Sequence, residues 1–333
     1  MSGIMMMVIA IVVLGGAYLL YGRYLQNKWG IDPKAKTPAY EMEDGVDYVP
    51  ADTNVVFGHQ FASIAGAGPI NGPIQAAIFG WLPVLLWILI GGVFFGAVQD
   101  FASMYASVKN KGRTIGYIIE AYIGKLGKKL FLLFCWLFCI LVVAAFADVV
   151  AGTFNGFATN DAGEVTKVVA NGAVATTSML FIFEAVGLGF FLKYTKFNKW
   201  VNTAFAIVLL VAAIALGLQF PMYVSLGTWH IIIFAYILVA SVAPVWALLQ
   251  PRDYLNSYLL IFMIVGAVIG VFAANPACNL QAFTSFNVDG QYMFPILFVT
   301  IACGAVSGFH SLVSSGTASK QIKNEKNMLP VSF

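Results

Sequence analysis

Residues 58–81 read GHQFASIAGAGPINGPIQAAIFGW, a stretch that is apolar enough to enter a bilayer but unsuited to one regular helix. Three glycines and two prolines fall within eight residues: Gly66, Gly68, Pro69, Gly72 and Pro73. Proline removes a backbone donor and glycine loosens the chain, so we expect the helix to break here. Broken backbone at membrane depth survives only inside protein or beside a wet cavity. Close packing of small residues is the alternative, and it explains the glycines better than the prolines.

The composition is that of a membrane protein. Of the 333 residues, 60% are hydrophobic and 10% are charged, whereas soluble domains carry about 25% charged residues. Most apolar segments approach the roughly 20 residues that a helix needs to cross a bilayer. We therefore expect an all-α polytopic membrane protein with nine apolar spans: 3–22, 57–80, 82–106, 129–152, 172–192, 201–218, 229–249, 255–273 and 293–313.

The positive charges divide unevenly between the two sides of this alternation. Seventeen of the 18 lysines and arginines fall on one side, and Lys167 falls on the other. Because positive loops stay in the cytoplasm, the N-terminus should lie outside. The predicted cytoplasmic segments are 23–56, 107–128, 193–200, 250–254 and the tail after 313. Residues 113–127 have an amphipathic pattern, which predicts a short helix either at the inner membrane interface or packed beneath the bundle.

A second proline-interrupted segment occurs in the seventh span, at Ala243 and Pro244. It follows the first by five spans, and an odd offset gives the two segments opposite orientations. Paired interruptions in inverted halves indicate a transporter binding site. The pattern predicts an incomplete inverted five-helix-repeat transporter fold with discontinuous helices. Its parts would be an extra N-terminal helix (1–22), a cytoplasmic connector (23–56), a first repeat (57–218) and a second repeat with its tail (229–333), from which two helices are missing.

The two interruptions are the predicted substrate site. Helix N-termini at a break carry free N–H groups and partial positive charge, which suit a carboxylate. We expect them to lie side by side near the membrane midplane, close to the hydroxyl-rich end of the ninth span. The predicted substrate-binding residues are Gly66, Gly68, Pro69, Gly72, Ala243 and Pro244.

Polar residues inside the spans are candidates for ion or proton coupling, since charge at membrane depth is costly. Asp100 either pairs with Lys109 or Lys111 or serves coupling, and Asp148, near an outer end, is open to solvation. A mid-span histidine is either a satisfied core residue or a proton carrier. Hydroxyls at a helix break can ligate Na⁺, relay protons or bond back to their own helix. The full set of candidates is Asp100, Asp148, Glu184, His310, Ser314, Ser315 and Thr317.

The sequence gives no sign of catalysis. GAGP lacks the spacing of a phosphate-binding loop, and the four cysteines have no metal or disulfide pattern. We expect no enzyme activity, no cofactor, no bound metal and no nucleic-acid partner. The expected partners are a small-molecule substrate, a coupling ion and membrane lipid.

Four long motifs resemble the carbon starvation protein A family. They are VDYVPADTNVVFGHQFASIAGAGPINGP (46–73), GAVQDFASMYASVKNKGRTIG (96–116), APVWALLQPRDYLNSYL (243–259) and VTIACGAVSGFHSLVSSGTASKQI (299–322). The likeness runs from about residue 17 to 326. Members are usually much longer, so the resemblance implies a truncated member.

The resemblance implies uptake of peptides or pyruvate during carbon starvation, coupled to H⁺ or Na⁺, across the bacterial plasma (inner) membrane. It also implies the fold of the amino acid–polyamine–cation superfamily, whose inverted five-helix repeats agree with the repeat inferred above. The residues do not choose between peptide and pyruvate, or between H⁺ and Na⁺. The alternatives are a membrane channel, which would need a continuous polar stripe, and a starvation-linked membrane sensor, which would need a soluble domain.

Overall fold

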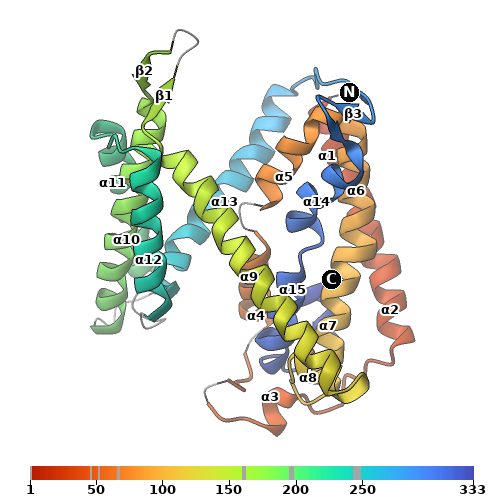
Figure 1. Ribbon diagram of the computed structural model, residues 1–333. Coiled ribbons are helices and arrows are strands. Elements are labelled where there is room, and N and C mark those ends of the chain that lie inside the picture. Colours follow the sequence, from red (N-terminus) through yellow and green to blue (C-terminus); the bar gives the residue numbers. More distant parts are fainter. Residues whose placement is uncertain are drawn as a thin grey trace. The chain divides into compact units, whose positions relative to one another are not determined.

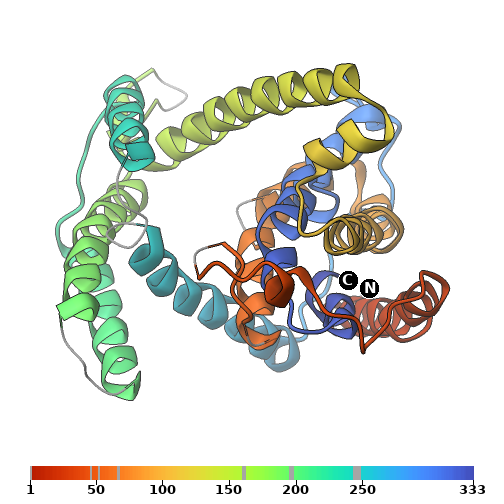
Figure 2. The ribbon, with the colours of Figure 1, turned by 90° about the horizontal axis from the view of Figure 1, so that it is seen from below.

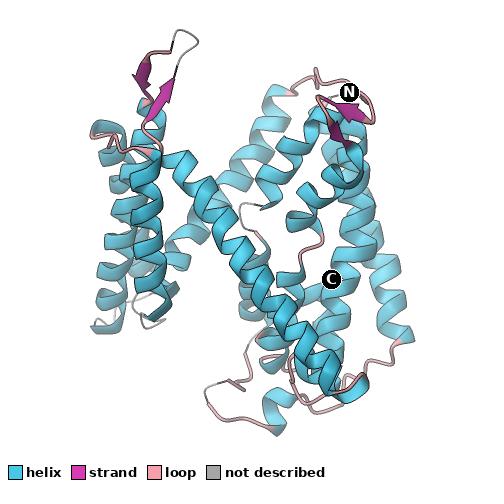
Figure 3. Cartoon of the chain, in the orientation of Figure 1, coloured by secondary structure: helices cyan, strands magenta, loops and turns pink. Residues whose placement is uncertain are grey.

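The chain is built mainly from helices (Figures 1 and 3). The structure is a computed structural model that describes residues 2–45, 47–51, 53–65, 68–159, 163–194, 199–242 and 249–333. Within these residues, five helical stretches are long and apolar enough to cross a membrane: Gly3–Lys28, Trp81–Lys109, Lys125–Phe154, Val169–Leu188 and Met293–Lys320. The prediction of a mainly helical protein with membrane-spanning helices is thus confirmed. Two short hairpins, β1–β2 and β3–β4, interrupt the all-α pattern in loops.

The chain divides into two compact units, and α9 and α13 contribute residues to both. Unit 1 comprises residues 1–132 and 266–333, and unit 2 comprises residues 133–265. The predicted repeat boundaries do not follow this division and remain a prediction.

Unit 1 contains both ends of the chain. Its helices begin with α1 and α2, which a π-helical turn joins, and end with the short α16. Between them, a strand pair (β3, Asn287–Val288; β4, Gln291–Tyr292) precedes α14. The helices are α1 (Gly3–Gly16), α2 (Arg23–Lys28), α3 (Pro38–Glu41), α4 (Thr53–Ile64), α5 (Gly68–Ala76), α6 (Trp81–Gly91), α7 (Val98–Lys109), α8 (Ile115–Tyr122), α14 (Met293–Ala305), α15 (Gly308–Gly316) and α16 (Met328–Ser332).

Unit 2 is formed by long helices and one hairpin, β1 (Phe157–Thr159) with β2 (Val165–Lys167). Helices α10 and α11 lie side by side (Figure 2). Trp229 is fully buried and packs edge-on against Phe154, with ring centroids 5.1 Å apart. The helices are α9 (Lys125–Phe154), α10 (Val169–Tyr194), α11 (Lys199–Gln219), α12 (Leu226–Val242) and α13 (Leu249–Ala274).

The second predicted span is broken, but over fewer residues than expected. Helix α4 ends at Ile64 and α5 begins at Gly68. Gly72 and Pro73 lie inside α5, so the prediction that the break extends to Pro73 is wrong. A proline in this place removes one backbone hydrogen bond, which a membrane helix tolerates when neighbouring helices hold it.

The ninth predicted span is also broken, and the sequence analysis placed no break within it. Helix α14 ends at Ala305 and α15 begins at Gly308. The Ser307 hydroxyl caps α15 by accepting a hydrogen bond from the Phe309 N–H (3.2 Å). Serine is a preferred N-cap residue, so the Ser307–Gly308 pair was the available signal.

The structure differs from the prediction in the residues that follow the seventh span, from 249 onward. The predicted turn at 250–254 is helical and belongs to α13, so that prediction is wrong. The stretch has no glycine that would end a helix, and Pro251 lies within α13. Ala243 and Pro244 lie outside the described residues.

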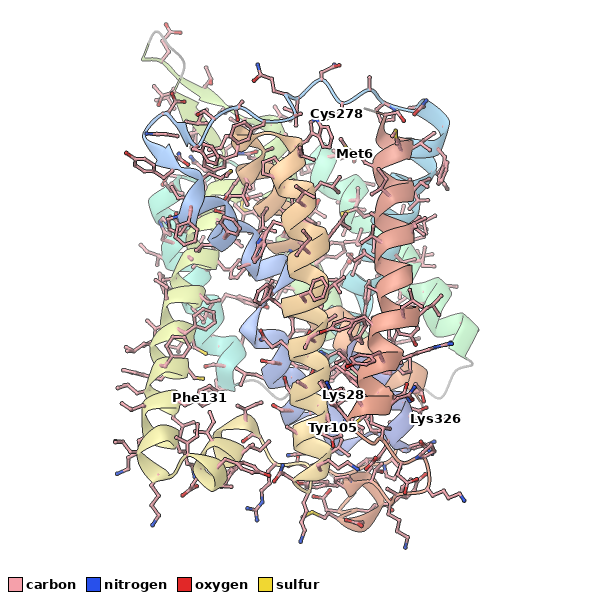
Figure 4. All side chains as sticks on the ribbon, turned by 90° about the vertical axis from the view of Figure 1, so that its right-hand side faces the viewer. Met6, Lys28, Tyr105, Phe131, Cys278 and Lys326 are labelled. Carbon is pink, nitrogen blue, oxygen red and sulfur yellow. The ribbon has the colours of Figure 1, made fainter. Side chains whose placement is uncertain are left out.

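The predicted cytoplasmic connector and tail contact each other in unit 1. The Lys320 ammonium lies 3.4 Å from a carboxylate oxygen of Asp47. Glu325 accepts hydrogen bonds from the Lys109 ammonium (2.8 Å) and from the backbone N–H of Asp32 (2.9 Å). Figure 4 shows Lys28 and Lys326 at one end of unit 1, with Met6 and Cys278 at the opposite end.

Candidate functional site

Helices α5 and α14, which adjoin the two helix breaks of unit 1, cross in close contact. A Cβ on Gly68 would lie 2.7 Å from the Cys303 sulfur, and one on Gly304 would lie 2.6 Å from the Pro69 Cα. One turn further along α5, a Cβ on Gly72 would lie 2.6 Å from the Thr300 carbonyl oxygen. These distances leave no room for a side chain, so the backbones of α5 and α14 touch. Glycine is needed here for close approach rather than for unusual dihedral angles.

This crossing contains three of the six predicted substrate residues: Gly68, Pro69 and Gly72. Gly66, Ala243 and Pro244 lie outside the described residues, so the expected pairing of the second and seventh spans remains a prediction. Among the described residues, the ninth span packs against the first break, through Cys303 and Gly304 of α14.

Helix α15 turns a polar face toward α4 and α7. The residues of this face recur at helical spacing: Ser307, His310, Ser311 and Ser314. Two glutamine amides bind it in the same manner, each donating to a carbonyl oxygen and to the hydroxyl four residues later.

On the α4 side, the Gln60 amide donates to the His310 carbonyl (3.3 Å) and to the Ser314 hydroxyl (2.7 Å). On the α7 side, the Gln99 amide donates to the Ser307 carbonyl (3.5 Å) and to the Ser311 hydroxyl (3.2 Å). The four bonds fix the rotation of α15 about its axis.

Asp100 and His310 form a buried pair at this face. The Asp100 Oδ2 lies 3.7 Å from the His310 Nδ1, and the two side chains are 6% and 5% exposed. Of the two alternatives for Asp100, the ion pair with Lys109 or Lys111 is not formed: Asp100 lies beside His310, and Lys109 pairs with Glu325. Nine residues at 100° each place Lys109 on the opposite side of the helix from Asp100.

Two acceptor atoms of the cluster remain available. Within the described residues, neither Asp100 Oδ1 nor Gln60 Oε1 has a hydrogen-bond partner, although both atoms are buried. A buried acceptor without a donor is costly in apolar surroundings. The Asp100 carboxylate can take up a proton, whereas the Gln60 amide oxygen can accept a hydrogen bond or ligate a small cation.

Asp100 and His310 line a cavity of about 260 Å³. A second cavity of about 350 Å³ is lined mainly by apolar residues, among them Pro69, Pro73 and Ile301. The residues that line both cavities are Gly92, Ala97, Gly304, Ala305 and Phe333. The helix crossing therefore adjoins one cavity with an ionisable pair and one cavity that is apolar.

The three predicted hydroxyls differ in their surroundings. Ser314 belongs to the polar cluster through Gln60. The Ser315 hydroxyl donates to the Leu312 carbonyl of its own helix (3.3 Å), as the alternative interpretation expected. Thr317 is exposed at the end of α15.

The two remaining carboxylates lie in unit 2. Asp148 is solvated, with 76% of its side chain exposed, and one oxygen lies 3.0 Å from the His230 Nε2. Glu184 lies within α10, and its Oε2 is buried with no hydrogen-bond partner among the described residues. The structure thus brings Asp100, His310 and Ser314 together in unit 1, while Asp148 and Glu184 belong to unit 2.

The sequence analysis missed Gln60 and Gln99. Both are amides within apolar spans, and each adjoins an ionisable residue in the sequence, His59 and Asp100. Such an amide must find partners in a membrane helix, and this was a usable signal for a buried polar contact.

Comparison with known proteins supports one family. The family model described as carbon starvation protein CstA matches residues 2–333. The chain is 37% identical to the "Peptide transporter CstA" of Escherichia coli (strain K12), with 93% of this chain and 44% of that protein covered. It is 37% identical to the "Pyruvate/proton symporter BtsT" of the same organism (97% and 45% covered) and 35% identical to the "Peptide transporter CstA" of Bacillus subtilis (strain 168) (100% and 55% covered). The chain spans about half the length of these relatives. No solved structure matches it.

Proposed function

Because the chain belongs to the carbon starvation protein CstA family, we propose that it is part of an ion-coupled secondary transporter for peptides or pyruvate-like small carboxylates. The names of the relatives, a peptide transporter and a pyruvate/proton symporter, support transport of these substrates. The observation that carries the proposal is the crossing of two broken helices beside a buried Asp100–His310 pair. Broken helices and intramembrane ionisable residues together are typical of transporter sites.

The proposed substrate site is the crossing itself. The N-terminus of α5 at Gly68 presents backbone N–H groups, which attract a carboxylate. Both pyruvate and peptides carry this group. The glycines let the substrate approach the backbone closely. Gly66, Ala243 and Pro244 remain proposed members of the site.

The proposed coupling centre is the polar cluster around α15. One proton can reside between the Asp100 carboxylate and the His310 imidazole, and a second can be taken up by the pair. Each change in charge alters the attraction between α7 and α15, which carry these groups. Ser314 offers an oxygen for Na⁺ in the alternative coupling mode, and Ser315 and Thr317 offer further oxygens nearby. Glu184 and Asp148 are proposed as additional carriers in unit 2.

Binding and uptake should be measured separately. Equilibrium dialysis of the chain in lipid nanodiscs with labelled pyruvate or dipeptide tests the site, and vesicle uptake under an imposed H⁺ or Na⁺ gradient tests coupling. We expect Asp100→Asn and His310→Gln to weaken the dependence of binding on pH, while Cys135→Ala leaves binding unchanged. Binding with the same pH dependence in all three variants would contradict the coupling assignment.

A further inference from the structure

The turn between α8 and α9 has a surface that the proposed transport function does not use. We call it the basic interfacial surface and define it by Arg113, Lys125, Lys129 and the apolar run Tyr122, Ile123 and Leu126. Helix α8 ends at Tyr122, the chain turns at Gly124 (φ +106°), and α9 begins at Lys125.

The apolar part of this surface is strongly exposed. Tyr122 and Ile123 are each 75% exposed, and Leu126 is 72% exposed. They continue into the exposed apolar side chains of α9, among them Leu130 (58%). Helix α9 is long and apolar enough to cross a membrane. The exposed side chains therefore begin where a membrane helix enters the bilayer, which is the place of an interfacial segment.

The charged part of the surface has a surplus of positive charge. Glu120 is the only acidic residue in the sequence between Asp100 and Asp148, and it is already paired. The Lys128 ammonium lies 2.5 Å from its carboxylate and 4.1 Å from the centre of the Tyr117 ring. This hydrogen bond lowers the pKa of Glu120 and keeps the carboxylate charged.

Glu120 is engaged by Lys128, and the nearby charges of Lys125 and Arg113 also act on it. Arg113, Lys125 and Lys129 are exposed, and one carboxylate cannot balance all of these cations. In the acidic connector of unit 1, Asp47 is paired with Lys320. Residues 113–129 thus carry four cations against one carboxylate, and this surplus of positive charge can meet a negative charge from outside the chain.

We propose that the basic interfacial surface binds the headgroups of anionic phospholipids. The apolar side chains would enter the headgroup and acyl boundary, and Arg113, Lys125 and Lys129 would meet the lipid phosphates and the net negative surface of the leaflet. Each basic residue near an anionic membrane strengthens binding roughly fivefold. Figure 4 shows nitrogen-tipped side chains gathered at the end of unit 1 where Lys28, Lys326 and Phe131 are labelled.

The chain itself, purified in neutral detergent, provides the test. Native mass spectrometry would compare retention of phosphatidylglycerol and phosphatidylcholine by the unmodified chain, by Lys125→Gln/Lys129→Gln and by Lys34→Gln/Lys36→Gln. The last variant is a matched control, because it removes two exposed lysines from the connector. We expect a preference for phosphatidylglycerol that falls at least tenfold in the first variant and stays within twofold in the control.

Two further measurements separate the sources of the signal. Raising the salt concentration from about 0.05 to 0.5 M should weaken retention of phosphatidylglycerol by the unmodified chain, since exposed charges are screened. Inorganic phosphate alone should not displace the lipid, because it lacks the acyl chains. Equal losses in both double variants, no preference over phosphatidylcholine, or full displacement by phosphate would each overturn the proposal.

Discussion

The close contact of α5 and α14 predicts that alanine at Gly304 destabilises unit 1. A Cβ there would lie 2.6 Å from the Pro69 Cα and 2.7 Å from its nitrogen. These atoms belong to the backbone, so a flexible side chain cannot move aside, and the helices must separate. Overpacking of this kind costs about 1–3 kcal/mol.

The matched control is Gly270→Ala in α13, where a new Cβ would meet nothing within 4 Å. Alanine favours a helix interior over glycine by about 1 kcal/mol; Gly270, inside α13, gains this in full, and Gly304, next to the last residue of α14, gains no more. Gly304→Ala should therefore be less stable than Gly270→Ala by at least about 1–3 kcal/mol, or roughly 5- to 150-fold in the unfolding equilibrium.

Unfolding in mixed micelles, followed by far-ultraviolet circular dichroism as denaturing detergent is added, measures this difference. The two variants share the same side chain, micelle and baseline, so the comparison does not depend on absolute stability. Equal midpoints for both variants would refute the backbone contact at the helix crossing.

Three further predictions concern the polar contacts and the crossing. Gln60→Met removes both hydrogen bonds that this amide donates to α15 and should lower unfolding free energy by about 1 kcal/mol; the exposed Gln219→Met in the same assay should change nothing. Lys109→Met leaves the Glu325 carboxylate, whose side chain is 4% exposed, without its cation, at a cost of about 1–3 kcal/mol once the partial exposure of Lys109 is allowed for. Adding Glu325→Met should restore part of the loss, and a double variant no more stable than Lys109→Met alone would contradict this. Saturating pyruvate or dipeptide should slow maleimide labelling of Cys303 severalfold while the thiols of α9 keep their rate, and unchanged labelling would place the substrate elsewhere.

The helical membrane character and the break before Gly68 could be predicted because they rest on local chemistry. Apolar length sets the first, and clustered glycine and proline set the second. Gly72 and Pro73 were wrongly included in the break, because the residue that packs against Gly72, Thr300 on α14, is more than 200 residues away in the sequence. Clustered glycine and proline indicate where a helix is poorly stabilised, whereas tertiary packing determines whether the helix breaks there.

The partners of the charged residues were the least predictable part. The sequence placed Asp100 near Lys109 by their separation along one helix. Lys109 pairs with Glu325, which is 216 residues away in the sequence. Asp100 pairs with His310, which is almost as distant in the sequence. Salt bridges between segments depend on the tertiary arrangement, which a single sequence does not display.

The two halves of the ninth span are fixed in different ways, and this difference bears on the proposed coupling. Helix α14 is held through backbone contacts at glycines, which tolerate little displacement. Helix α15 is held through amide, hydroxyl and carboxylate contacts, which can exchange partners with little change in volume. The break at 306–307 separates these two kinds of attachment. A change in the protonation of Asp100 and His310 would therefore act first on α15, while α14 keeps its place against the proposed substrate site.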